Sequence, residues 1–475
     1  MLFISILVAM LLVGPKTFNL DGDLGRHITI GGYILNNFSI PTLDIFSFTM
    51  NGQPLTPHEW LAQVIFALTH QGISLSGPVL VIALLIGFTF SIVYHDSQRC
   101  SKMPLLSIVF VIWAAAASSL HWLARPHIFT FFYLALWTYL LEQISQDKKI
   151  PVWLFGILML LWANTHGAFI AGFVVWCAYV GGDLLEAWAQ KQWLPAKLKT
   201  WIMIGILSFA VTFINPVGAH LWDTSFSFIR NSYLVSHTQE YLPPNFHSPA
   251  TWPFLALVAF SVMASSISTK RLPFHQALLL TGWTALALYS VRNIPLYAIV
   301  AAPILSQMTT HWFETSRWNT MEKNIIQIEQ QLHGWLWPVV CTLAASFVLL
   351  TPAMQAYNTY DPAVFPVQAM DWLVENPQQG QGFNHFSWGG YMLYRQWPGQ
   401  LVFIDGQTDF YGEKLTREYE QVVSLSIGWE QVLEKYQINW VLIPTNSALV
   451  IALSQLSGWS VGYHDETATI INKGD

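Results

Sequence analysis

The chain has 475 residues, of which 53% are hydrophobic and only 10% are charged, and its formal net charge is −6. Soluble domains carry roughly 25% charged residues, so this composition excludes an ordinary soluble globular protein. Long apolar runs recur along the chain and predict a polytopic α-helical membrane protein. The negative net charge predicts no nucleic-acid partner.

The N-terminal apolar segment, residues 2–13, lacks a basic flank and a clear cleavage site. We therefore expect a short signal anchor rather than a cleaved signal peptide. Three cysteines lie far apart, in or beside apolar segments. Their spacing predicts neither a disulfide framework nor a metal site.

About eleven apolar segments are candidate membrane spans by the usual length criterion. They cover residues 2–15, 76–94, 104–120, 128–144, 151–164, 168–184, 201–214, 251–268, 275–290, 294–310 and 335–352. The 151–184 region fits either a helical hairpin or one broken helix. Lys and Arg gather in alternate loops, which places the N-terminus in the cytoplasm and residues 353–475 outside. The spans together predict a transmembrane domain over residues 1–352.

The first outer loop, residues 16–75, is long and not plainly polar. Amphipathic patterns at 25–36 and 57–69 predict two helices that lie in the membrane interface. Pro57 and Glu59 stand in the first turn of the second pattern, as is typical of a helix start.

Residues 353–475 carry more charge than the rest of the chain. Strand-like runs and helical patterns alternate there, which predicts a small extracytoplasmic α/β domain. The expected strands are 400–405, 439–444 and 468–472, and the expected helices are 366–376, 413–436 and 446–456.

An acidic cluster directly follows the first apolar segment. Asp21 and Asp23 are one residue apart, and Arg26 and His27 come next. Two such carboxylates can bind a divalent cation such as Mg or Mn, or one can act as a general base while the other orients it. A solvated turn that caps the next helix is the alternative interpretation.

Other polar residues fall on the same outer face under this topology. Arg125 is suited to bidentate phosphate binding. The alternative interpretation is that its long side chain snorkels at the membrane edge, with the charged end in water. His166 interrupts two apolar runs and is a candidate for metal or phosphate binding, or for a structural turn. Arg292 has little polar sequence around it, so we expect a buried, paired charge whose partner includes an anionic ligand.

A further group of residues is expected to line the substrate site from the same face. Its members are Arg26, His27, Glu59, His127, Asn293, Trp388, Tyr391 and Asp405. For the glycine- and aromatic-rich segments 387–391 and 403–407, plain turn architecture is the alternative.

The chain resembles the GT-C superfamily of membrane glycosyltransferases. Asp21-Gly22-Asp23 matches the acidic motif of the first outer loop in that superfamily. The stretch 31–60 is similar to the first loop of bacterial members, through Ile40-Pro41, Asp44, Phe46-Ser47, Thr49 and Glu59-Trp60. The region of Trp388-Gly-Gly-Tyr391 and Asp405 is distantly similar to the Trp-Trp-Asp-Tyr-Gly segment of oligosaccharyltransferase catalytic subunits, but it lacks the Asp of that segment.

This resemblance implies an enzyme of the bacterial inner membrane that moves a sugar from a polyprenyl-phosphate donor to a glycan, lipid or protein acceptor. It implies inverting attack at the outer face, with Asp21 or Asp23 as the general base. The leaving lipid phosphate would be held by Arg125 or Arg292, with help from His166 or a cation.

Two other function classes are compatible with many spans and polar residues at membrane depth. A transporter or flippase for a lipid-linked sugar would be expected to show paired half-repeats, and the sequence has no evident repeat. A non-catalytic subunit of a membrane complex would keep the fold without the chemistry.

Overall fold

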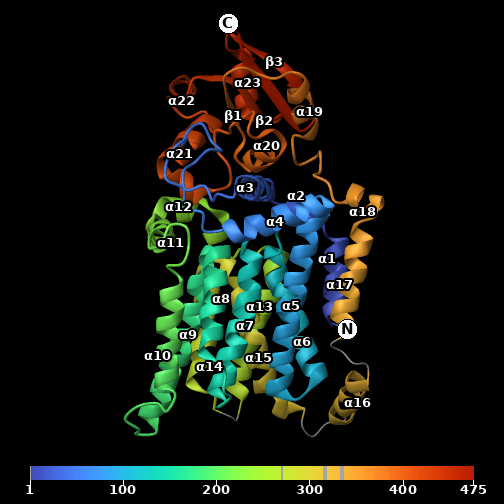
Figure 1. Ribbon diagram of the computed structural model, residues 1–475, viewed down its shortest axis with the longest axis vertical. Helices are drawn as coiled ribbons and strands as arrows, with labels where there is room; N and C mark the ends of the chain where they lie inside the picture. Colours follow the sequence, from blue (N-terminus) through green and yellow to red (C-terminus); the bar gives the residue numbers. More distant parts are fainter. Residues whose placement is uncertain (1, 269–270, 314–317, 332–335, 475) are drawn as a thin grey trace.

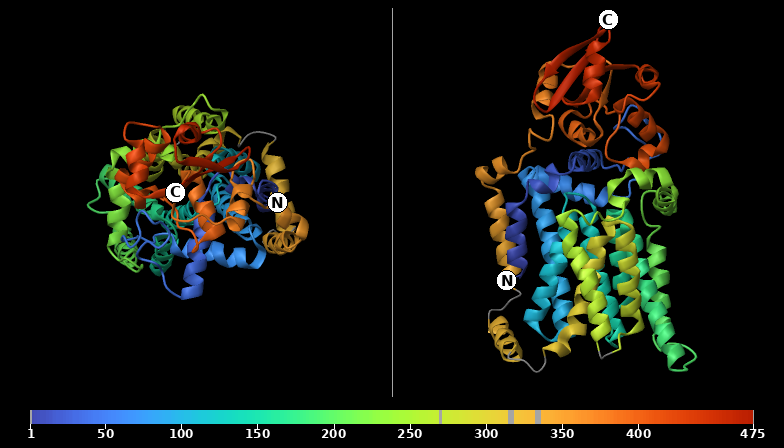
Figure 2. Two further views of the ribbon diagram at one scale, coloured as in Figure 1. Left: turned by 90° about the horizontal axis from the view of Figure 1, so that it is seen from above. Right: turned by 180° about the vertical axis from the view of Figure 1, so that it is seen from behind.

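The structure is a computed structural model that describes residues 2–268, 271–313, 318–331 and 336–474. A long helical bundle forms the body of the molecule, and a small domain with a mixed sheet lies at one end of it (Figure 1). Figure 2 shows the same arrangement from above and from behind, with the C-terminus at the far end of the small domain. The predicted fold class, a mostly helical membrane protein with a small C-terminal α/β portion, agrees with this arrangement.

The bundle consists of apolar helices of unequal length. They are α1 (Leu2–Leu12), α5 (Ser76–Ser101), α6 (Pro104–Ser118), α7 (His127–Ser145), α8 (Val152–Thr165), α9 (Ile170–Ala189), α10 (Leu198–Val211), α13 (Trp252–Ile267), α14 (Phe274–Tyr289), α15 (Ile294–Thr309) and α17 (Leu336–Leu349). Within the described ranges, five helical segments are long and apolar enough to cross a membrane: Ser76–Ser101, Pro104–His121, His127–Ser145, Gly167–Ala189 and Pro249–Ile267. The total of about eleven spans stays a prediction.

Helix α15 lies in the interior of the bundle. Nearly all of its residues are buried, including Ala298, Ala301 and Ala302. Small side chains let neighbouring helices approach closely, which is how helices associate in lipid. By contrast, α13 keeps several large apolar side chains exposed, among them Val262 and Leu255, as expected for a helix that faces lipid.

The 151–184 region forms a hairpin of two helices. Helix α8 ends at Thr165 and α9 begins at Ile170, with a single 3₁₀ turn between them. Lys197, beyond the end of α9, pairs with Asp147, just before the start of α8, at 3.1 Å. The two outer ends of the pair therefore return to the same side of the bundle.

The first outer loop folds into short helices that lie across the end of the bundle, beneath the small domain (Figure 1). They are α2 (Lys16–Asn19), α3 (Asp23–Asn37) and α4 (Trp60–Ile73). Helices therefore form at both predicted amphipathic patterns, with α4 starting and ending a few residues later than expected. Their position in the membrane interface stays a prediction. A side chain at Gly31 of α3 would place its Cβ 2.0 Å from the carbonyl oxygen of Gln63, so glycine is what lets α3 and α4 touch.

Further helices lie outside the bundle and the small domain. They are α11 (His220–Arg230), α12 (Ser232–His237), α16 (Trp318–Gln331) and α18 (Pro352–Tyr357). Helix α16 lies at the end of the bundle opposite the small domain (Figure 1).

The small domain surrounds a four-stranded sheet in the order β1-β2-β4-β3, in which only the β1–β2 pair is parallel. Its elements are α19 (Val367–Glu375), β1 (Gln381–Asn384), α20 (Gly389–Gln396), α21 (Thr408–Val423), α22 (Trp429–Lys435), β2 (Ile438–Pro444), α23 (Ala448–Gln455), β3 (Trp459–His464) and β4 (Ala468–Lys473). The central strands β2 and β4 are almost wholly buried, which matches their apolar sequences.

Two sequence predictions in this domain are wrong. Residues 400–405 do not join the sheet, because Val402 instead forms an isolated bridge to Ser47 of the first outer loop. The helix expected over 413–436 is divided into α21 and α22. The backbone takes positive φ at Leu425 and Gly428 between them, and a right-handed helix cannot continue through that conformation.

A seam of glycines joins α3 to the small domain. A Cβ at Gly22 would lie 1.9 Å from the carbonyl oxygen of Ser387, and one at Gly25 would lie 2.4 Å from that of Gly390. On the other side, a Cβ at Gly390 would lie 2.4 Å from the carbonyl oxygen of Gly22. Backbone therefore packs directly on backbone, and this contact fixes the acidic cluster of α3 against the segment before α20.

Candidate active site

A cavity of about 450 Å³ lies where α3, the end of the helical bundle and the small domain meet. Its size is within the usual range for small-molecule sites. Residues from the first outer loop, the bundle and the start of α21 contribute to its wall. They are Asp23, Arg26, His27, His58, Glu59, Arg125, Pro126, His127, His166, Gly167, Ala168, Ile170, Ala171, Val174, Thr224, Ser225, Thr238, Glu240, Tyr241, Trp283, Leu286, Tyr289, Ser290, Arg292, Asn293, Leu296, Gly406, Gln407, Thr408 and Asp409.

Arg125 stands at the centre of the acidic side of this cavity. Its Nη2 donates to Asp21 Oδ1 at 2.6 Å and lies 3.2 Å from Asp23 Oδ2, and its Nε also bonds the Asp21 carboxylate. Its Nη1 donates to Glu240 Oε1 at 2.5 Å. One guanidinium therefore binds three carboxylates, which uses the planar fork that distinguishes arginine from lysine.

Arg26 forms a second link, between the first outer loop and the small domain. Its Nη1 donates to Gln407 Oε1 at 2.6 Å, its Nη2 lies 3.7 Å from Glu59 Oε2, and its Nε lies 3.8 Å from Asp405 Oδ1. The residue is almost fully buried. Because a buried charge needs such partners, Arg26 fixes the position of the small domain over α3.

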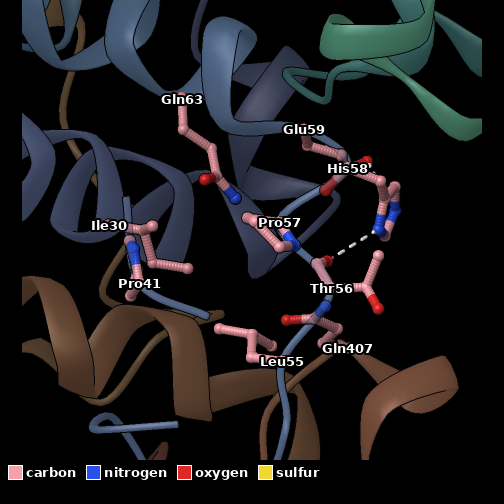
Figure 3. A pocket seen from close by; sticks show the side chains of 9 residues that line it. All are labelled: Ile30, Pro41, Leu55, Thr56, Pro57, His58, Glu59, Gln63 and Gln407. Atoms are coloured by element: carbon pink, nitrogen blue, oxygen red, sulfur yellow. Dashed lines mark hydrogen bonds and ion pairs between the residues drawn. The ribbon is translucent and has the colours of Figure 1, made fainter. Parts of the chain in front are cut away.

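Glu59 lies among histidines at the start of α4. Its carboxylate is 3.8 Å from His27 Nδ1, 3.9 Å from His58 Nε2 and 4.0 Å from His166 Nε2. Figure 3 shows Glu59 and His58 on one side of a smaller adjoining cavity, with Gln407 of the small domain on another. The imidazole of His58 is oriented by the carbonyl of Thr56, 3.1 Å from its Nδ1.

Burial shapes the protonation of these groups. Burial raises the pKa of Asp23 above its ordinary value, although Arg125 acts in the opposite direction. Burial likewise raises the pKa of Glu59, against His58 and Arg26, and that of Asp405 to about 6. Burial also opposes ionisation of Glu240, but Arg125 and Arg292 outweigh it and lower its pKa to about 2. The cavity thus combines a firmly ionised carboxylate with others that exchange protons more readily.

Arg292 is the third arginine of the site. Its guanidinium lies over the ring of Tyr241, 4.3 Å from the centroid, which is a cation–π geometry. Among the residues that the structure describes, no carboxylate forms an ion pair with it, in contrast to Arg26 and Arg125. Arg292 therefore keeps a charge that faces the cavity without a bound counter-ion.

The structure brings most of the predicted site residues together. Those that line the cavity are Asp23, Arg26, His27, Glu59, Arg125, His127, His166, Arg292 and Asn293. Asp21 and Asp405 stand just behind the wall, where each binds one of the arginines. The capping interpretation of the acidic cluster also has some basis, since Asp21 Oδ1 accepts a hydrogen bond from the amide of Asp23 at 3.3 Å.

Trp388 and Tyr391 do not line the cavity, contrary to expectation. The indole of Trp388 is buried and donates to the carbonyl of Val364 at 2.9 Å. The hydroxyl of Tyr391 accepts from Arg395 within α20 at 2.8 Å. These aromatic side chains belong to the apolar core that is continuous with that of the bundle, where Tyr391 packs against Tyr360 and Phe365, and the neighbouring glycines serve the contact with α3.

Several cavity residues were missed by sequence reasoning. They are His58, Thr408 and Asp409. Gln407 lies in the segment 403–407 that was considered for the substrate site, and Glu240 and Tyr241 lie in the outer loop 231–250, whose place on the outer face makes it a candidate wall of a groove. Asp409 had no usable signal, since an acidic residue in the first turn of a helix is ordinary.

The carboxylates do not fit a bound divalent cation as they are arranged. Across the described parts of the chain, no three or more His, Cys, Asp or Glu side chains come together in a way that could hold a metal ion. Asp21 and Asp23 instead share the guanidinium of Arg125. A Mg or Mn requirement stays a prediction from the sequence, and the chemistry below is derived from the protein's own groups.

Solved structures resemble this architecture over nearly its whole length. An oligosaccharyltransferase from Archaeoglobus fulgidus, in the apo form, matches 93% of this chain and 69% of its own length at 12% identity, with a TM-score of 0.62. The oligosaccharyltransferase AglB of the same organism, in complex with an inhibitory peptide and a dolichol-phosphate, matches 99% and 74% at 12% identity, with a TM-score of 0.60. ArnT from Cupriavidus metallidurans, bound to undecaprenyl phosphate, matches 99% and 97% at 12% identity, with a TM-score of 0.54.

The chain has the GT-C fold. AglB and ArnT are both GT-C glycosyltransferases, so the resemblance seen in the sequence agrees with the three-dimensional comparison. No family model matches the chain, and no curated protein matches its sequence. The GT-C fold is shared here at 12% identity, so the function must be argued from the cavity itself.

Proposed function

We propose that this protein is a membrane glycosyltransferase that moves a sugar from a polyprenyl-phosphate donor to an acceptor hydroxyl at the outer face of the membrane. The observation that carries the proposal is that Asp23 and Arg292 line the same cavity. A buried carboxylate faces that cavity together with a cation that has no bound counter-ion. Glycosyl transfer from a lipid phosphate needs these two groups, a base for the acceptor and a cation for the leaving phosphate.

Asp23 is the better base of the two acidic candidates. It lines the cavity, whereas Asp21 lies behind it and binds Arg125 through both carboxylate oxygens. Asp23 would accept the proton of the acceptor hydroxyl as that oxygen bonds the anomeric carbon. The bond from the anomeric carbon to the phosphate oxygen breaks at the same time, and its electron pair leaves with the lipid phosphate. Attack from the side opposite the phosphate inverts the anomeric configuration.

Arg292 would bind the departing phosphate. Its charge is available, while that of Arg125 is shared among three carboxylates. Arg125 then has a positioning role, because its contact with Asp23 orients the base. A fixed cation in a site with little water stabilises developing phosphate charge strongly.

The apolar end of the cavity supports a lipid-linked donor. Val174 of α9 and Leu286 and Tyr289 of α14 line this end, and all three are exposed on the side of the bundle. In a membrane, such side chains face the acyl chains. The polyprenyl chain would leave the cavity between these two helices while its phosphate stays near Arg292.

The test is transfer by purified protein in liposomes that contain undecaprenyl-phosphate-linked sugars, with extracts of membrane glycans, lipids and peptides as acceptors. We expect Asp23→Asn to lower the transfer rate by about 10²–10⁴-fold, the usual share of a positioned base. Asp21→Asn is the matched variant and is expected to lose less, since Asp21 does not line the cavity. Movement of the lipid-linked sugar across the bilayer without a new glycosidic bond would overturn the proposal in favour of a flippase. Equal activity of Asp23→Asn and the wild type would remove Asp23 as the base.

A further inference from the structure

The imidazole of His166 is held in one orientation at the junction of α8 and α9. The residue is 8% exposed and its ring reaches the cavity from the bundle side. Its Nδ1 accepts a hydrogen bond from the backbone amide of Ala168 at 3.4 Å. A backbone N–H can only donate, so Nδ1 carries no hydrogen.

A chain of buried hydrogen bonds supports the same side of the ring. The indole of Trp162 donates to Thr130 Oγ1 at 2.9 Å, and an indole N–H has no acceptor capacity. Thr130 Oγ1 lies 2.9 Å from His166 Nδ1 and so directs its own hydrogen to that nitrogen. Both Trp162 and Thr130 are almost completely buried, in α8 and α7, where water does not compete.

Two donors at Nδ1 leave only one tautomer for a neutral ring, with the hydrogen on Nε2. The ring is neutral at ordinary pH, because burial, and then the nearby Arg292 and His127, lower the pKa of His166 well below its ordinary value. His166 is therefore a neutral hydrogen-bond donor whose N–H points away from Thr130.

The Nε2 hydrogen has no close protein acceptor within the described structure. The nearest carboxylate oxygen, Glu59 Oε1, is 4.0 Å away, and an N–H···O hydrogen bond needs 2.7–3.2 Å. Both side chains line the cavity. An oxygen atom of a bound molecule can therefore approach Nε2 from the open side of the cavity, beside Glu59.

We propose that Thr130 and Trp162 hold His166 as its Nε2–H tautomer, and that this N–H donates to a phosphate oxygen of the lipid-linked donor. The second half of this proposal rests on the proposed function, whereas the first half does not. Thr130 is a positioning residue, since it acts only through His166. A neutral donor complements Arg292 here, because it stabilises the phosphate without bringing a second full charge near Arg125.

The first test is nitrogen NMR of protein labelled with ¹⁵N-histidine in liposomes. The His166 signals are those that disappear in His166→Asn. We expect an unprotonated Nδ1 and a protonated Nε2 in the wild type and in Thr130→Ser, and a mixture of tautomers in Thr130→Val. Addition of undecaprenyl phosphate should shift the Nε2 signal. A hydrogen on Nδ1 in the wild type would overturn the tautomer assignment, even if Thr130→Val does not fold. An Nε2 signal unchanged by saturating lipid phosphate would overturn the donor contact.

The second test is kinetic and compares two amides. The side-chain nitrogen of glutamine reaches roughly the place of Nε2, while that of asparagine reaches the place of Nδ1. We expect His166→Gln to keep a larger kcat than His166→Asn, with a loss of about 10²-fold in the latter, as for other single donors to developing charge. Thr130→Ser should restore the rate lost in Thr130→Val. Equal rates in the two amide variants would overturn the role of Nε2–H. If the wild type transfers no sugar while the NMR pattern holds, the proposed function fails and the tautomer assignment stands.

Discussion

The carboxylate of Asp23 lies directly against the backbone of Gly406. A Cβ at Gly406 would stand 1.8 Å from Asp23 Oδ1, so no other residue fits that position without moving the carboxylate. The base proposed in the first outer loop is thus fixed by a turn of the small domain, hundreds of residues away in sequence.

We predict that Gly406→Ala lowers kcat by about 10²-fold, because displacing a catalytic group by about 1 Å has that effect. Gly72→Ala in α4 is the control, since a Cβ there meets no atom within 4 Å. The measurement is the transfer rate at saturating donor. A Gly406→Ala variant with wild-type kcat would mean that Asp23 is not held by this turn.

The glycine seam predicts opposite effects for two positions of α3. Gly25→Ala should destabilise the protein by about 1–3 kcal/mol, because it forces extra atoms into a packed contact. Gly32→Ala should stabilise it by about 0.5–1 kcal/mol, because its Cβ meets open space and alanine favours helix. Thermal unfolding in detergent measures both. Similar Tm values for the two variants would argue against the seam.

Substitution of Arg125 should mainly lower the folding stability, whereas substitution of Arg292 should mainly lower the activity. Arg125→Gln leaves three carboxylates without their shared cation and should cost about 3–5 kcal/mol of folding free energy. Arg292→Gln should leave the Tm nearly unchanged and lower kcat by about 10²-fold, since it removes one stabilising group from the leaving phosphate. If Arg292→Gln unfolds the protein instead, its charge has a structural role.

The rate should depend on pH through Asp23. The base must be ionised, so kcat/KM falls as pH falls through the pKa of Asp23. Burial raises that pKa, which places the acid limb above the value of about 3.9 for an exposed aspartate. Glu240, with a pKa lowered to about 2, stays ionised across this limb. A profile flat down to pH 4 would contradict the assignment.

Chelation tests the cation that the sequence suggests. Since Arg125 already bridges Asp21 and Asp23, we expect transfer to continue at an unchanged rate in excess EDTA. Zero activity in EDTA that returns with Mg or Mn would mean that Arg125 moves aside for a metal ion.

The sequence was sufficient to predict the features with local causes. Apolar runs predicted the helices, the amphipathic patterns predicted α3 and α4, and the acidic cluster marked the wall of the cavity around Asp23. Arg125 and Arg292 were identified because charge is rare in this chain.

What the sequence missed depends on contacts between distant segments. Strand β3 is short and mostly exposed, so it has no apolar alternation to detect. Val402 pairs with the first outer loop rather than with the sheet, and only the folded chain reveals this partner. The segment 387–391 was expected to line the substrate site, but its glycines at 389 and 390 serve close backbone contacts. The ranking of Asp23 over Asp21 needed the position of the cavity.

The link between Arg26 and Gln407 also bears on biosynthesis. The two residues are 381 positions apart, and the carboxylate of Asp405 comes almost as late in the chain. A nascent chain therefore holds the buried guanidinium of α3 without these partners until residues 405–407 have been made. The cavity is completed only after the helices of the bundle have been synthesised, and a chain stopped before residue 405 would lack the wall formed by residues 406–409.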